Sequence, residues 1–135
     1  MQFPVDQTAG QVASLIRAID ERLSVRLLRE PGVEQLKGEL FAGHAVIVPA
    51  SGVALQNPFF RRPGPRYHML VLRGYTTDGY FITNDPGTKR GEGYLYPYSR
   101  IMEAMADWNP ELQQADASRK VVVVIEPMDS GTPRQ

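Results

Sequence analysis

Apolar residues recur every three or four positions near the start of the chain, which predicts an amphipathic helix. Thr8 or Asp6 can cap its first turn. A second, shorter pattern of the same kind predicts another helix from Val33 to Phe41, ended by Gly43. The apolar positions of the first helix are Val12, Leu15, Ile16, Ile19 and Leu23.

Runs of β-branched and other apolar residues predict strands between and after these helices. We expect a short strand at 25–28, a buried strand at 45–48 that Pro49 ends, and a last buried strand at 121–125. Residues 51–65 are expected to form a long loop, and in a small domain a loop of this length usually has a function.

The second half of the chain shows a strand, a turn and a returning strand. Residues 67–75 alternate in polarity, Asp78-Gly79 is a hairpin turn signal, and residues 80–83 return antiparallel. A further extended piece follows at 94–98, and Ser99 is expected to cap a helix that holds Trp108. Helices at the start and an antiparallel sheet later predict an α+β fold.

Composition narrows the classes of partner and chemistry. The 135 residues are 42% hydrophobic and carry no formal net charge, which argues against nucleic acid or anionic lipid as the main partner. The sequence contains no cysteine, so these residues supply no disulfide, thiolate metal site or thiol nucleophile. No motif indicates a metal or another cofactor, and neither a membrane span nor a signal peptide is evident. The sequence does not indicate the cellular compartment of the protein.

One histidine and one aspartate are expected to meet at the end of the predicted hairpin. His68 stands near the start of the first strand and Asp85 just after the second, so folding at Asp78-Gly79 brings them to the same end of the sheet. A carboxylate on one ring nitrogen holds an imidazole in one tautomer, as a general base requires. The alternative is a histidine that binds a turn carboxylate for structural reasons alone.

The stretch from His68 to Thr88 resembles the second half of a papain-like cysteine peptidase domain, of family thirty-nine, the bacteriocin-processing type. Residues 39–48 are similar to the helix, glycine and apolar strand of that family. The resemblance implies cleavage of a peptide bond by a Cys-His-Asp triad, with His68 as general base and Asp85 orienting it. It implies a peptide or protein substrate. The nucleophilic cysteine of the family, at the start of an early helix after a glutamine, has no counterpart in this sequence.

Two explanations for the missing cysteine are considered. In the preferred one, residues 1–126 are the C-terminal portion of a single papain-like domain, an upstream segment holds the nucleophile helix, and residues 127–135 form a flexible tail. In the other, the domain is complete but degenerate, with Ala9 in the place of the cysteine. Either way we expect the chain alone to be inactive. Two other functions compete with the peptidase interpretation. One is a non-catalytic module that binds a peptide or protein, and the other is a different thiol acyl-transfer enzyme.

Several side chains are weaker candidates for the site. Phe59 and Phe60 either contact a peptide substrate or pin their loop to the core, and Tyr67 is a further candidate for substrate contact. Ser51, in the same loop, is the one hydroxyl worth following as a nucleophile, although nothing around it resembles a nucleophile elbow. His44, at a strand entrance, is expected to be an exposed surface residue.

Overall fold

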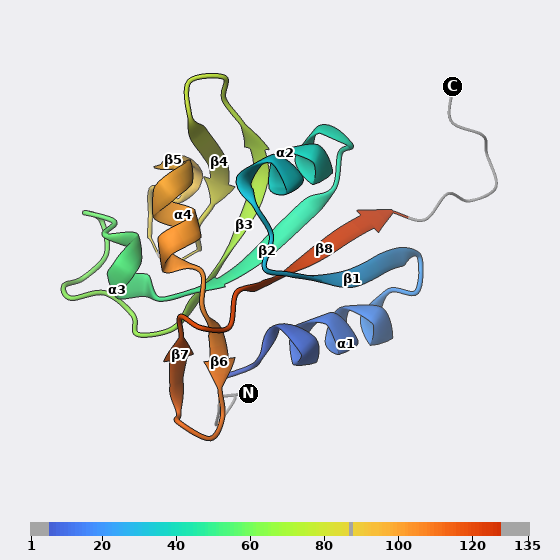
Figure 1. Ribbon diagram of the computed structural model, residues 1–135, viewed down its shortest axis with the longest axis horizontal. Coiled ribbons are helices and arrows are strands. Elements are labelled where there is room, and N and C mark those ends of the chain that lie inside the picture. The colour runs from blue at the N-terminus through green and yellow to red at the C-terminus, as the bar shows by residue number, and fades with distance from the viewer. Residues whose placement is uncertain (1–5, 87, 128–135) are drawn as a thin grey trace.

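A six-stranded antiparallel sheet forms the centre of the computed structural model, which describes residues 6–86 and 88–127 (Figure 1). The strand order is β1-β8-β2-β3-β4-β5, and a separate small hairpin pairs β6 with β7. The sheet strands are β1 (Leu23–Arg29), β2 (Ala45–Ala50), β3 (His68–Tyr75), β4 (Tyr80–Asn84), β5 (Glu92–Pro97) and β8 (Val121–Pro127). The hairpin strands are β6 (Asp107–Asn109) and β7 (Gln114–Asp116), and the helices are α1 (Ala9–Ile19), α2 (Val33–Phe41), α3 (Gly52–Leu55) and α4 (Tyr98–Ala104).

The helices divide between the two faces of the sheet. α1 packs over β1 and β8, where Ala9 and Ala13 join Val25, Val121 and Val123 in one apolar cluster. The other three helices contribute to a larger core on the opposite face, which fills the space above β2, β3, β4 and β5. This arrangement confirms the α+β class with an antiparallel sheet. None of the helices in residues 6–86 and 88–127 has the length and the apolar character of a membrane span.

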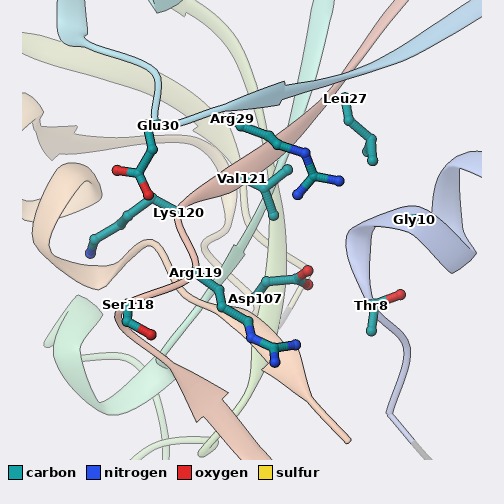
Figure 2. A pocket seen from close by; sticks show the side chains of 10 residues that line it. All are labelled: Thr8, Gly10, Leu27, Arg29, Glu30, Asp107, Ser118, Arg119, Lys120 and Val121. Carbon is teal, nitrogen blue, oxygen red and sulfur yellow. The ribbon is translucent and has the colours of Figure 1, made fainter.

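The start of α1 is fixed by three hydrogen bonds. Thr8, one of the two N-cap candidates, forms a capping box with Gln11. The Ala9 amide donates to Asp107 Oδ1 at 2.9 Å, which ties the helix to β6. A cavity of about 470 Å³ lies beside this attachment, and in Figure 2 the side chains of Arg29 and Arg119 line it from the strand side while Thr8 lines it from the helix side.

The β3–β4 hairpin forms as predicted and positions the candidate pair. Gly79 occupies the turn with a positive φ of 106°, a conformation that glycine adopts without steric cost. Val71 pairs with Asn84, so the start of β3 and the residue after β4 lie at the same end of the sheet. Both His68 and Asp85 therefore belong to one short edge of the molecule, at the end where α1 begins.

Five expectations about local structure are corrected. α1 ends at Ile19, and Leu23, expected on that helix, begins β1. Pro49 lies inside β2. The pairing of β2 with β8 stops at Ile47, so the N–H group that proline lacks is not needed to bond a carbonyl of β8. The predicted loop 51–65 contains the short helix α3. α4 starts at Tyr98 with Pro97 as its N-cap, so Ser99 lies in the first turn. Trp108 belongs to β6, not to a helix. The predicted tail lies outside the described residues from 128 onward.

Candidate active site

The predicted contact between His68 and Asp85 is present. His68 Nε2 lies 2.5 Å from Asp85 Oδ1, and the two side chains are 11% and 0% exposed. The other ring nitrogen, Nδ1, makes no hydrogen bond to any residue that the structure describes. An imidazole bound this way keeps one nitrogen for orientation and the other for proton transfer.

Asp85 is held on its far side by residues that the sequence did not point to. Tyr96 Oη donates to Asp85 Oδ2 at 2.6 Å, and Asn57 Nδ2 donates to Tyr96 Oη at 2.9 Å. Burial raises the pKa of Tyr96, with the hydrogen bond to Asp85 adding to the effect, so the phenol stays protonated and can donate. The backbone amide of Asp85 donates to Gly91 O at 2.9 Å.

Phe59 and Phe60 have different environments. The Phe60 ring is 7% exposed and lies edge-on to the His68 ring, with 5.2 Å between the centroids. Phe59 is 48% exposed and lies near the Tyr94 ring and the Arg90 guanidinium. Of the two alternatives raised for this pair, Phe60 pins its loop beside the imidazole, and Phe59 is the ring that a ligand could reach.

Tyr67 is largely committed to contacts within the protein. Its hydroxyl donates to Gln7 O at 2.6 Å and its ring packs on Trp108 with a centroid distance of 5.2 Å. Burial, together with the nearby Asp107 carboxylate, raises the pKa of Tyr67. A hollow of about 360 Å³ opens beside it, lined by Asp6, Gln7, Val12, Leu15, Tyr67, His68 and Met69.

The remaining sequence candidates have structural roles. Ser51 Oγ accepts from the Ala54 amide at 3.1 Å as the N-cap of α3, and no hydrogen bond joins Ser51 to His68 in the described part of the chain. His44 is not the exposed residue that we expected. Its side chain is 13% exposed, because Glu39 and Glu126 hold its two ring nitrogens at 2.8 and 2.7 Å. Residues 6–86 and 88–127 show no cluster of three or more His, Asp or Glu able to hold a metal.

Sequence comparison identifies the family. The model of the Peptidase_C39 like family matches residues 16–116, most of the chain. The chain belongs to the peptidase C39-like family. The family resemblance predicted from residues 68–88 is therefore confirmed. No curated protein matches the sequence.

A solved structure shows the same fold. The chain is similar to the crystal structure of a putative C39-like peptidase from Bacillus anthracis, with a TM-score of 0.61 and 15% sequence identity. The match covers 93% of this chain and 62% of the other, so the chain spans less than two thirds of the length of that protein. At this identity the similarity establishes the shared fold alone.

The sequence carried no signal for the support behind Asp85. Tyr96 lies in the predicted extended piece at 94–98 and Asn57 in the predicted loop at 51–65, and neither position indicates a contact with the site. They meet because β5 pairs with β4 and the 51–65 segment folds back over the core, contacts that span 39 positions of sequence. Taken together, the site offers an oriented imidazole with one free nitrogen, a chemistry suited to moving a proton.

Proposed function

We propose that this chain supplies the base half of a peptide-hydrolysing centre, with His68 as general base and Asp85 as the residue that orients it. The observation that carries the proposal is the 2.5 Å contact between His68 Nε2 and the buried carboxylate. Asp85 accepts a hydrogen bond from Nε2–H, which leaves the lone pair on Nδ1 to take a proton from a nucleophile. Membership of the peptidase C39-like family supports a peptide or protein as the substrate.

The nucleophile in this proposal is a cysteine thiol from outside the 135 residues, because the sequence contains none. His68 Nδ1 takes the thiol proton, and the sulfur bonds to the carbonyl carbon of the scissile peptide bond. The C–N bond then breaks, and the leaving amine receives the proton from the imidazolium. Water hydrolyses the thioester, with Nδ1 taking a proton from the water and returning it to the sulfur.

We further propose that residues 1–126 are the C-terminal portion of a longer peptidase domain. An upstream segment would contribute the cysteine at the start of a helix, where the backbone amides favour a thiolate. The fact that the chain spans 62% of the similar solved structure supports this proposal. By this reasoning the 135 residues alone hydrolyse no peptide.

The test is to express the chain together with the coding sequence that lies upstream of Met1. We expect a peptide carrying a thiol-reactive group to label the longer protein, and His68→Ala to slow labelling roughly a hundredfold, the usual contribution of a general base. His44→Gln is the matched control, because the other histidine of the chain is held by Glu39 and Glu126 and should not affect labelling. An upstream segment without cysteine, or labelling that ignores His68→Ala, would refute the proposal.

A second candidate function is a non-catalytic peptide-binding module. The hollow of about 360 Å³ beside His68 favours it, since Val12, Leu15 and Met69 give it an apolar lining. In this case the 135 residues alone bind peptides with bulky apolar side chains, and Leu15→Ser weakens that binding. Leu112→Ser is the control, because Leu112 is also exposed and does not line the hollow. Calorimetry with a peptide library measures both variants.

A further inference from the structure

We infer that Asn57 and Tyr96 form a relay that positions Asp85, which makes Tyr96 a positioning residue for the general base. The inference rests on the proposed function of His68. It extends the group from a His-Asp pair to a chain of four side chains: His68, Asp85, Tyr96 and Asn57.

The direction of the hydrogen bonds in this relay is fixed. The Phe59 amide donates to Asn57 Oδ1 at 2.8 Å, which sets the orientation of the amide and leaves Nδ2 as the group facing Tyr96. An amide nitrogen can only donate, so Tyr96 Oη accepts from it. The single phenolic proton is then directed to Asp85 Oδ2, 2.6 Å away.

Burial makes this donated proton energetically important. Asp85 is 2% exposed as a residue, and Tyr96 and Asn57 are 1% and 6% exposed. An ionised carboxylate removed from water is stable only where hydrogen-bond donors replace the water, and a phenol supplies a strong one at short range. Tyr96 therefore stabilises the negative charge of Asp85 and fixes the plane of its carboxylate. The fixed carboxylate in turn orients the His68 ring.

The relay also joins the 51–65 segment to the site. Asn57 lies directly after α3, and Phe60 from the same segment packs on the His68 ring. One segment therefore contacts the His68 ring through Phe60 and the Tyr96 hydroxyl through Asn57. A change in this segment is expected to reach the general base without touching either His68 or Asp85.

The neighbouring tyrosine on β5 supplies a matched control. The Tyr94 ring lies 4.7 Å from the Tyr96 ring and comes from the same strand. Its hydroxyl makes no hydrogen bond with any described residue. Tyr94→Phe and Tyr96→Phe therefore remove the same atom from adjacent rings, but only Tyr96→Phe removes a donor from Asp85.

The experiment is NMR of the 135-residue protein labelled with nitrogen-15 at its two histidines. The signal is the Nε2 proton that His68 donates to Asp85. We expect Tyr96→Phe to shift this proton downfield, because a carboxylate that has lost one donor accepts more strongly from the next, or to lose it to exchange with water. Tyr94→Phe should leave it in place. If both variants leave the signal unchanged, or both shift it equally, the relay is wrong.

A double-mutant cycle tests the position of Asn57 in the relay. We expect Asn57→Ala to shift the His68 proton when Tyr96 is present and to have no further effect in the Tyr96→Phe background, because Asn57 acts through the phenol. Additive shifts would refute the ordered relay. None of these measurements needs peptide hydrolysis. The relay and the proposed peptidase function are therefore tested independently, and either can fail while the other holds.

Discussion

Gly91 lies so close to the backbone of Asp85 that no side chain fits between them. A Cβ placed on Gly91 would lie 1.6 Å from the Asp85 carbonyl oxygen, far inside contact distance. The two residues are also joined by the hydrogen bond from the Asp85 amide to Gly91 O. Gly91 therefore packs directly on the backbone of the residue that contacts His68.

Gly91→Ala is expected to push the loop away from Asp85 and to reduce the free energy of unfolding by about 1–3 kcal/mol, the range of overpacked sites. It should also move the His68 Nε2 proton signal, because the displaced backbone carries the carboxylate. Urea unfolding and NMR measure the two effects. Gly38→Ala is the control: nothing lies within 4 Å of a Cβ there. In the middle of α2 this change should stabilise the protein by roughly 0.5–1 kcal/mol. Unchanged stability of Gly91→Ala would contradict the steric argument.

The same substitution is expected to have different effects at the two adjacent phenylalanines. Phe60→Ala removes a buried ring against His68 and is expected to cost about 3–5 kcal/mol of stability, as deletions of buried aromatic side chains do. Phe59→Ala removes a half-exposed ring and should cost less than about 1 kcal/mol. Thermal unfolding of both variants tests this difference. Equal losses would show that the two rings are anchored alike.

Glu39 gives the protein a defined response to acid. Burial opposes its charge, but hydrogen bonds from His44 and Arg26 outweigh burial and lower the pKa of Glu39 below its usual 4.5. A carboxyl with a lower pKa in the folded state stabilises the fold above its unfolded pKa, and this stabilisation is lost as the pH falls through the folded value.

Glu39→Gln should therefore be less stable than the parent protein at pH 7, and the difference should shrink towards pH 3. Glu34→Gln, on the exposed side of the same helix, is the control and should show little difference at either pH, because its carboxylate meets Lys37 at the surface. Urea unfolding at both pH values provides the measurement. A difference for Glu39→Gln that does not change with pH would mean that the carboxylate charge is not what stabilises the fold.

The sequence predicts the part of the site that depends on local pairing. Asp78-Gly79 specifies a tight hairpin, and the register of a hairpin fixes which ends meet, so His68 and Asp85 could be paired without a structure. Tyr96 and Asn57 could not be predicted, because their contact depends on how β5 and the 51–65 segment pack in three dimensions.

The end of α4 illustrates the same limit for the fold. Apolar spacing favours a helix that continues to Trp108, yet α4 ends at Ala104. Lys120 Nζ donates to three carbonyls at this end, those of Met102, Glu103 and Met105, and the Ala106 amide donates to Pro49 O. These partners come from distant parts of the chain and satisfy the backbone groups that a longer helix would have used.

Asp107 ties the start of α1 to the small β6–β7 hairpin and provides the last prediction. Its Oδ1 accepts from the Ala9 amide at 2.9 Å and from the Trp108 amide at 2.8 Å, so one carboxylate oxygen holds the start of α1 against β6. A negative charge at this position also interacts favourably with the positive end of the helix.

Asp107→Asn keeps an acceptor oxygen but removes the charge, and should cost about 1 kcal/mol of stability. Asp107→Ala removes both and leaves the Ala9 amide buried without a partner, which should cost about 2–4 kcal/mol. Hydrogen exchange should show faster exchange of the α1 amides in Asp107→Ala, with the β3 and β4 amides unaffected if the effect stays local. Equal stability of the two variants would mean that the charge, not the hydrogen bond, attaches α1 to β6.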